Sequence, residues 1–358
     1  MAARPYAAFI EGGLISRIGE QLRQVLPERP RYYVITVPRV RKHWGRKLAA
    51  SMDRAGLACQ MIEMPDGERH KTMATVTKLA EKLVRGGADR KSAVIALGGG
   101  VVGDVAGFLA SIYMRGLDVV QVPTTLLAQV DASIGGKTGV DLPAGKNLLG
   151  TFHQPRAVFI DPQVLATLPE REYRSGLFEA VKCGIIRRRD LFEYMEQNRE
   201  GILRRDAAAL EYLIAECVAV KAAVVAADER EGDLRRILNF GHTVGHALEA
   251  ETRYKTFRHG EAVAWGMVAA TKIAVALGKT DAETAQRIVS TVQAYARLPR
   301  VKVRGKRMAR RLRSDKKTVD GVVHFVLPVE IGRVEMVADV PERVIVEAVE
   351  ELRLLSKS

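Results

Sequence analysis

The sequence predicts an α/β amino-terminal domain built on a parallel sheet, followed by a mostly α-helical carboxy-terminal domain. Up to about residue 160, short β-branched runs alternate with stretches whose apolar residues have helical spacing. Beyond that point, alanine-rich segments with apolar residues three, four and seven apart predominate, as packed helices require. We therefore expect two domains, residues 1–163 and residues 164–358.

Five runs of the first domain are expected to be strands because they are rich in β-branched and apolar residues. They are Tyr32–Val37, Cys59–Met64, Ser92–Leu97, Asp118–Pro123 and Ala157–Pro162. Between the second and third of them, Thr72–Gly87 has apolar residues at helical intervals and ends in glycine, which is typical of a helix. Strands and helices that alternate in this way predict a parallel sheet with helices packed on it.

Helical spacing is clearest in the second domain in two alanine-rich segments, Asp206–Glu231 and Gly260–Gly278. A short hairpin-like pair is expected only near the end, within Gly321–Val337. A cleft between two such domains is the expected place for a small ligand.

The composition is that of an ordinary globular protein, with 358 residues, 47% hydrophobic and 27% charged. The apolar runs are too short for a membrane span, and the start of the chain lacks the apolar core of a secretory signal. Cys59, Cys183 and Cys217 lie far apart, which predicts neither a disulfide framework nor a zinc–thiolate site. We expect a cytoplasmic protein.

The formal net charge of +14 is compatible with nucleic acid, an acidic membrane surface or a small anionic substrate as partner. The densest basic run is Val303–Lys317, but basic residues also recur singly beside glycine and histidine motifs. Nucleic-acid binding does not require that arrangement, and no zinc-finger or RNP-like pattern accompanies it. The pattern favours a small anionic substrate.

A glycine-rich turn follows the third predicted strand and satisfies the pattern G-x-G-x-x-G. Its glycines are Gly98, Gly99, Gly100 and Gly103. Such a turn lets backbone N–H groups approach a pyrophosphate at a helix N-terminus, as in Rossmann-like domains. The acidic candidate for a ribose contact, Glu68, lies upstream and not downstream, so a purely structural turn is the alternative interpretation.

Two Gly-Lys pairs follow an aspartate, Asp131, within Val122–Pro155. The lysines are Lys137 and Lys146, and Thr124 and Thr125 precede them in the same stretch. A lysine set directly after a glycine can reach an anion because the backbone beside it is unobstructed. We interpret the stretch as part of an anion pocket.

Three of the seven histidines, His242, His246 and His259, fall within thirty residues. His242 and His246 are four apart and share a face if helical, as metal ligands often do. Glu179 supplies a carboxylate three residues before Lys182, in an apolar context where a charged pair is costly without a partner. The set predicts a metal site suited to zinc, with histidines that serve packing alone as the alternative.

Several motifs in order give the chain a specific resemblance to a known family. They are "PDGERHK" (Pro65–Lys71), "LGGGVVGDVAGFLASIYMRG" (Leu97–Gly116), "VPTTLLAQVDASIGGKTGV" (Val122–Val140), "GKNLLGTFHQP" (Gly145–Pro155), "LNFGHTVGHALE" (Leu238–Glu249), "HGEAVAWGM" (His259–Met267) and "SDKK" (Ser314–Lys317). From about Asp66 to Lys317 the chain resembles the 3-dehydroquinate synthases of the sugar phosphate cyclase superfamily.

The resemblance implies roles for individual residues. The metal ligands would be Glu179, His242 and His259, and His246 would contact the substrate instead. The other substrate-contacting positions would be Arg115, Asp131, Lys137, Asn147, Lys182, Lys221, Arg235, Asn239 and one of Lys316 and Lys317. The cofactor-binding positions would be Asp66, Gly67, Glu68, Arg69, His70, Lys71, Gly100, Val101, Val102, Gly103, Asp104, Thr124, Thr125, Lys137, Lys146 and Thr167.

The resemblance also implies an activity. Members convert 3-deoxy-D-arabino-heptulosonate 7-phosphate to 3-dehydroquinate and phosphate in the shikimate pathway, with NAD+ and one Zn2+ or Co2+. They are commonly homodimers, with Arg115 expected to act across the interface. Another sugar phosphate cyclase, a metal-dependent polyol dehydrogenase and a basic nucleic-acid-binding protein are the alternatives. Thr36-Val37-Pro38 departs from the family pattern near the adenosine ribose, and Ala132 and Asp141 replace frequent serine and asparagine.

Overall fold

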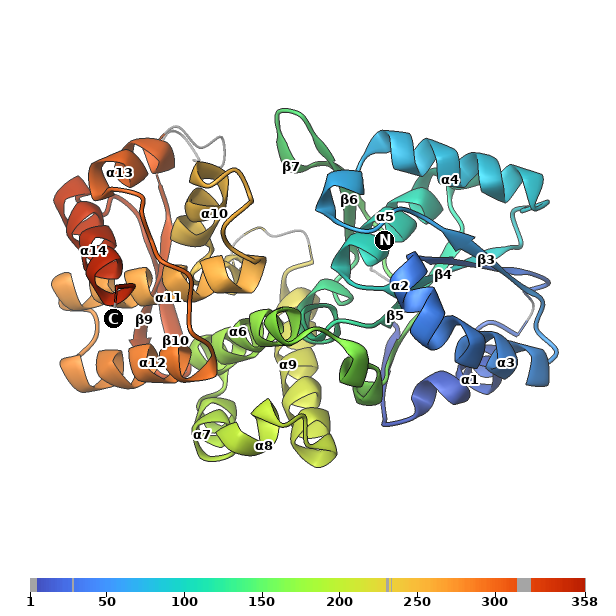
Figure 1. Ribbon diagram of the computed structural model, residues 1–358, viewed down its shortest axis with the longest axis horizontal. Helices are drawn as coiled ribbons and strands as arrows, with labels where there is room; N and C mark the ends of the chain where they lie inside the picture. Colours follow the sequence, from blue (N-terminus) through green and yellow to red (C-terminus); the bar gives the residue numbers. More distant parts are fainter. Residues whose placement is uncertain (1–4, 28, 230–231, 233, 314–322, 358) are drawn as a thin grey trace. The chain divides into compact units, whose positions relative to one another are not determined.

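The computed structural model describes residues 5–27, 29–229, 232, 234–313 and 323–357, so Lys316 and Lys317 lie outside the described residues. The chain forms two compact units (Figure 1). The first comprises the chain up to Pro169 together with Leu210–Val218, and the second comprises Glu170–Ala209 and the chain from Ala219 onward. The first contains a parallel sheet and the second is largely helical, which confirms the predicted fold class.

The sheet of the first unit has six strands in the order β1-β8-β5-β4-β2-β3, and every neighbouring pair is parallel. The strands are β1 (Ala7–Ile10), β2 (Tyr32–Thr36), β3 (Cys59–Glu63), β4 (Ala93–Gly98), β5 (Asp118–Pro123) and β8 (Ala157–Ile160). All five predicted strands are present. Within this six-stranded sheet, only β1 was not expected, because it has just four residues and is defined by its pairing with β8.

Helices cover both faces of this sheet (Figure 1). The helical segments of this unit are η1 (Leu14–Ser16), α1 (Ile18–Val25), α2 (Pro38–Val40), η2 (Arg41–Gly45), α3 (Arg46–Arg54), η3 (Glu68–His70), α4 (Met73–Arg85), α5 (Gly100–Ile112), η4 (Tyr113–Arg115), η5 (Ala128–Ala132) and η6 (Pro162–Thr167). Tyr33 and Ile35 of β2 pack with α4 and α5, whereas Tyr32 and Val34 pack with α1 and α3. Because both faces are covered, the central strands are apolar at most positions.

A β-hairpin, β6 (Lys137–Leu142) and β7 (Gly145–Phe152), packs against α5. Thr151 of β7 donates a hydrogen bond of 2.8 Å to Ser111 of α5. The hairpin was not predicted from the sequence, where the two Gly-Lys pairs indicated loops. Strand pairing overrides that local preference because the Thr138 and Thr151 hydroxyls, 2.9 Å apart, hold the two strands together.

The second unit is built around one buried helix, α11 (His259–Ala276), which contacts α6, α10, α12, α14 and β9. The surrounding elements are α6 (Glu170–Arg187), α7 (Arg189–Gln197), α8 (Arg199–Leu203), η7 (Leu234–Asn239), α10 (His242–Glu251), α12 (Ala282–Tyr295), α13 (Gly305–Arg313), α14 (Glu342–Leu355), β9 (Phe325–Glu330) and β10 (Arg333–Val337). Helix α9 (Ala207–Ala227) contributes to both units. The two predicted helical segments and the terminal hairpin are therefore present. Within the described residues, no helix combines the length and apolar character needed to cross a membrane.

Candidate active site

Three elements of the second unit bring Glu179, His242 and His259 together. The Oε1 atom of Glu179 lies 3.8 Å from Nε2 of His242 and 3.6 Å from Nε2 of His259. Ligand atoms around one tetrahedral zinc ion, at ~2.0–2.2 Å from it, are about 3.3–3.6 Å apart. The three side chains are thus placed to share one ion after small adjustments.

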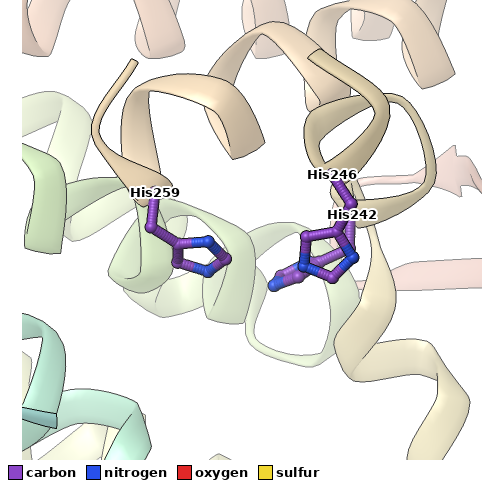
Figure 2. A group of neighbouring side chains, drawn as sticks. All are labelled: His242, His246 and His259. Carbon is purple, nitrogen blue, oxygen red and sulfur yellow. The ribbon is translucent and has the colours of Figure 1, made fainter. Parts of the chain in front are cut away.

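The histidines come from the start of two neighbouring helices. Figure 2 shows His242 and His246 on α10 and His259 on α11, with their rings turned toward a common space. Ligand atoms of the three rings lie within 4.8 Å of one another. A set of three imidazoles and a set that contains Glu179 instead of His246 are therefore both compatible with this spacing.

The close approach of α6 and α11 depends on a glycine, Gly260. A Cβ atom at this position would lie 1.9 Å from the carbonyl oxygen of Ser175, so no other residue fits without displacement of a helix. The Gly260 N–H group also donates a hydrogen bond of 3.0 Å to the Ser175 hydroxyl. Because Glu179 follows Ser175 by one helical turn, this contact sets the distance between Glu179 and His259.

Glycines also bring α10 against α11. A Cβ atom on Gly266 would lie 1.7 Å from the carbonyl oxygen of Gly241, which itself has a left-handed backbone, with φ of 79°. Gly241 directly precedes His242, the first residue of α10. The backbone contact therefore determines where His242 enters the site.

Glu179 is fully buried, and its charge is incompletely compensated by the protein. Among the described residues, neither of its carboxylate oxygens accepts a well-directed hydrogen bond, although the Lys182 ammonium forms an ion pair with Oε2. Burial of a carboxylate without hydrogen bonds is costly. A divalent cation bound at Oε1 would remove that cost, so the residues present fit a metal ion.

The remaining ring nitrogens of the two histidines face acceptors. Nδ1 of His242 lies 3.1 Å from the Phe240 carbonyl oxygen, and Nδ1 of His259 lies 3.4 Å from a carboxylate oxygen of Glu249. Since a carbonyl or carboxylate only accepts, each Nδ1 carries the proton, and in the neutral ring each Nε2 presents a lone pair, as a metal ligand must. Burial lowers the pKa of His259, but the Glu249 hydrogen bond and the Glu179 charge outweigh burial, so the pKa lies above its usual value.

Other predicted residues of the second unit are buried around α6. Lys182 lies beside Glu179 on α6, and Lys221 lies on α9. Arg235 is almost completely buried in η7, which packs against α6, and it donates a hydrogen bond of 2.5 Å to the Glu229 carbonyl. Asn239 ends the same η7 segment.

The first unit places the glycine-rich turn where its sheet order reverses. The chain leaves β2 toward β3 and leaves β4 toward β5 on the opposite side, so the carboxyl ends of β2 and β4 form a topological switch point. Gly99 joins β4 to α5, and Thr124 follows β5 and donates its N–H to the Gly98 carbonyl at 2.9 Å. The predicted positions Gly100 to Asp104 form the first turn of α5.

Two buried hydroxyls at these strand ends lack partners. Among the described residues, neither Thr36, the last residue of β2, nor Thr124 finds a hydrogen-bond partner for its side chain. A buried hydroxyl without a partner is uncommon, and a bound ligand at these strand ends would supply one. Thr36 was not assigned to the cofactor from the sequence. Its position at the end of a predicted strand beside the glycine turn is the signal that identifies it.

Several predicted cofactor and substrate residues meet around Lys71, which is almost completely buried. Its ammonium lies 2.6 Å from Asp104 and also donates to Asn147, while Lys146 pairs with Glu68 at 3.3 Å. Burial lowers the pKa of Lys71, but the charges of Asp104 and Glu68 leave it above its usual value. The cluster therefore joins η3, α5 and the hairpin.

Asn147 has a left-handed backbone, with φ of 54°, and Asp141 accepts its N–H at 2.8 Å. Burial raises the pKa of Asp141. The aspartate thus supplies the acceptor oxygen that an asparagine at the same position would offer. The departure at Asp141 leaves the hairpin turn intact.

The remaining predicted positions of the first unit lie on separate segments. Trp44 donates a hydrogen bond of 2.9 Å to Thr167, Asp131 lies in η5 and Lys137 begins β6. Arg115 and Met114 both have left-handed backbones, with φ of 71° and 48°. Such strain in non-glycine residues costs about 1–3 kcal/mol each and often marks functional positions.

Comparison with known proteins decides the family. Residues 61–175 match the model described as 3-dehydroquinate synthase N-terminal, and residues 176–318 match 3-dehydroquinate synthase C-terminal. The chain is 58% identical over 355 residues to 3-dehydroquinate synthase from Koribacter versatilis (strain Ellin345), which covers 99% of this chain and 97% of that protein. The chain belongs to the 3-dehydroquinate synthase family. The resemblance stated from the motifs is confirmed.

Solved structures place this 3-dehydroquinate synthase family member among sugar phosphate cyclases. A 2-epi-5-epi-valiolone synthase from Streptomyces hygroscopicus subsp. jinggangensis 5008, with NAD+ and Zn2+ bound, has a TM-score of 0.90 at 29% identity, over 99% of this chain and 98% of that chain. A 2-deoxy-scyllo-inosose synthase complexed with carbaglucose-6-phosphate, NAD+ and Co2+ has a TM-score of 0.88 at 28% identity, over 98% of each chain. The shared architecture does not by itself distinguish among the ring-forming reactions.

Proposed function

We propose that the protein converts 3-deoxy-D-arabino-heptulosonate 7-phosphate to 3-dehydroquinate and phosphate, with NAD+ and one divalent ion, Zn2+ or Co2+. The full-length similarity to 3-dehydroquinate synthases supports the activity. The observation that carries the site is the buried Glu179 carboxylate, without hydrogen bonds among the described residues and facing two Nε2 atoms. This geometry favours Glu179, His242 and His259 over a set of three histidines.

The bound groups would supply two kinds of chemistry. A divalent ion held by Glu179, His242 and His259 would act as a Lewis acid toward the hydroxyl that is oxidised, and NAD+ would accept a hydride and later return it. Oxidation would make the adjacent C–H acidic, so phosphate would leave by β-elimination. Reduction, ring opening and intramolecular aldol closure would then follow, and NAD+ would be regenerated in every turnover.

The chain's own residues would bind and orient the substrate. Lys182 beside Glu179, together with Lys221 and Asp131, would orient the hydroxyl region. The cationic and amide side chains would hold the carboxylate and the phosphate: Arg115, Lys137, Asn147, Arg235, Asn239, His246 and a lysine of the Lys316–Lys317 pair. The departing phosphate can take the proton, so the main contribution of the protein is positioning.

In the first unit, NAD+ would bind at the switch point of the sheet. The pyrophosphate would meet the glycine turn and the N-terminus of α5, which carries partial positive charge. The partnerless Thr124 hydroxyl and the cluster of Glu68, Lys71 and Lys146 support this placement. The remaining predicted cofactor positions, including Thr167, stay predictions.

We further propose a cytoplasmic homodimer that uses the apolar surface of β7 and the end of α5. Leu148 and Phe152 are 52% and 48% exposed, and Ile112 and Met114 are 43% and 42% exposed. The contact between α5 and β7 supports a shared surface for these side chains, and Arg115 directly follows Met114. Apolar surfaces of this kind mark association sites.

One assay tests the proposed activity. Purified protein is given the seven-carbon substrate and catalytic NAD+, and inorganic phosphate is measured with and without a chelator. We expect phosphate release in excess of NAD+, 3-dehydroquinate as the product, and loss of both with chelator. Accumulation of NADH would identify a polyol dehydrogenase instead, and turnover restricted to another sugar phosphate would identify a different cyclase.

A further inference from the structure

We propose that Glu249 is a positioning residue of the metal centre, whose carboxylate orients the His259 ring and fixes its tautomer. This inference rests on the proposed metal binding at Glu179, His242 and His259. It adds a residue that neither binds the ion nor contacts the substrate.

The position of Glu249 on α10 directs it toward the site. It follows His242 by seven residues and His246 by three, so all three lie on one face of the helix. Its side chain is 5% exposed, although glutamate is almost never buried unless it is paired. The Glu249 carboxylate therefore faces the interior of the unit and not solvent.

The hydrogen bond to Glu249 determines which tautomer the His259 ring adopts. The Glu249 Oε2 atom lies 3.4 Å from Nδ1 of His259, and Nε2 of the same ring lies 3.6 Å from Glu179. An ionised carboxylate only accepts, so in the neutral ring the proton is on Nδ1 and the lone pair is on Nε2. Glu249 therefore selects the tautomer that can bind an ion beside Glu179.

The two histidines are oriented by different kinds of acceptor. His242 uses the backbone carbonyl of Phe240 at 3.1 Å, which no substitution of a side chain removes. His259 uses a charged side chain, which also increases the electron donation of the ring to an ion. Substitution of residue 249 should therefore change the metal affinity. The orientation of His242 depends on no such side chain.

The local backbone holds Glu249 in place. Its carbonyl accepts the N–H of Tyr254 at 2.7 Å, and Tyr254 has a left-handed backbone, with φ of 56°. The Thr252 hydroxyl donates to the same carbonyl at 3.2 Å. These contacts fix the end of α10 from which the carboxylate reaches His259.

The test compares Glu249→Gln and Glu249→Ala with Glu251→Gln, a matched control on the same helix whose carboxylate pairs with Arg307 and not with a histidine. Zn2+ affinity is measured by competition with a chromogenic chelator, and the visible spectrum is recorded for the Co2+-loaded protein. We expect Zn2+ affinity to fall about tenfold in Glu249→Gln and up to ~100-fold in Glu249→Ala, with a changed cobalt spectrum. Glu251→Gln should match the wild type in both measurements.

If Glu249 had a purely structural role, its substitution would lower the thermal midpoint of the metal-free protein. The isosteric Glu249→Gln variant would then keep the wild-type Zn2+ affinity. Wild-type Zn2+ affinity and an unchanged cobalt spectrum in Glu249→Gln would overturn the inference. His259→Ala separates this failure from failure of the metal site. If His259→Ala loses Zn2+ while both Glu249 variants retain it, only the role of Glu249 is wrong; if His259→Ala also retains it, the proposed site is wrong as well.

Discussion

Gly260 and Ser175 lie in such close contact that a Cβ atom on the glycine would stand 1.9 Å from the serine carbonyl oxygen. This contact joins the helix that carries Glu179 to the helix that begins with His259. The proposed ligands Glu179 and His259, which lie far apart in the sequence, are therefore positioned by backbone packing, before any ion contributes.

Gly260→Ala is expected to destabilise the protein and to weaken metal binding together. The added methyl group forces α6 and α11 apart, and overpacking of this kind costs about 1–3 kcal/mol in the free energy of unfolding. Urea denaturation and Zn2+ competition measure the two effects. Gly201→Ala in α8, where a Cβ would make only ordinary contacts at 3.8 Å, serves as the control. Equal stability of the two variants would contradict the packing argument.

His246→Ala and His259→Ala are expected to fail in different ways. His259→Ala should lose both stoichiometric metal and turnover, because one proposed ligand of the ion is removed. His246→Ala should retain metal and lose substrate affinity, because the proposed ligand set does not include its ring. Metal analysis by mass spectrometry and the phosphate assay distinguish the two. Loss of metal in His246→Ala would favour the set of three histidines.

Lys137→Ala is expected to weaken substrate binding far more than NAD+ binding. The lysine follows a glycine at the start of β6, and its charge is assigned to an anionic group of the substrate. Calorimetry with each ligand separately measures the two affinities. Lys78→Ala, at another exposed lysine in the same unit, should change neither. An equal loss of substrate affinity and NAD+ affinity in Lys137→Ala would contradict the assignment of Lys137 to the substrate.

Thr124→Val is expected to reduce NAD+ affinity without loss of stability in the absence of NAD+. The hydroxyl is buried and finds no partner among the described residues, so its removal costs the unliganded protein nothing. A hydrogen bond of ~1 kcal/mol to NAD+ corresponds to roughly a fivefold change in affinity. Thr138→Val provides the contrast because Thr138 bonds to Thr151 at 2.9 Å, so its removal should lower stability and spare NAD+ affinity. An unchanged NAD+ affinity in Thr124→Val would contradict the placement.

Phe152→Glu is expected to shift the protein from dimer to monomer. The charge would be placed in the apolar surface of β7, where desolvation on association is unfavourable. Sedimentation velocity at several protein concentrations measures the change. Val84→Glu, at an apolar residue on α4 that is 64% exposed, should leave the dimer intact. A wild-type protein that sediments as a monomer would show that this surface has another role.

The sequence predicts most of the fold because its signals are local. The strands of the central sheet have apolar runs bounded by turns, and α11 has helical spacing over most of its length. The start of α11 is also encoded locally, since Glu261 accepts the Arg258 N–H at 2.8 Å as part of a capping box. By contrast, β1 and the hairpin β6–β7 depend on pairing and on contacts with α5, which no local pattern specifies.

The candidate site likewise has residues that local sequence patterns predict and residues that they do not. Histidine spacing and the Glu179–Lys182 pair indicate a metal site from the residues alone, while the choice of ligands came from the family resemblance. Neither Glu249 nor Thr36 is predicted from the sequence. The role of Glu249 depends on His259, which lies on another helix, and that of Thr36 on the absence of a hydrogen-bond partner among the described residues. The seven-residue interval from His242 to Glu249 is a signal that helical periodicity makes available.

Anomalous diffraction at the zinc edge, from crystals of the Zn2+-loaded protein, tests the central claim most directly. The account predicts one strong peak bonded to a Glu179 oxygen and to Nε2 of His242 and His259, with His246 unbonded. A peak held by the three histidines with Glu179 still paired only to Lys182, or a peak elsewhere in the chain, would contradict it.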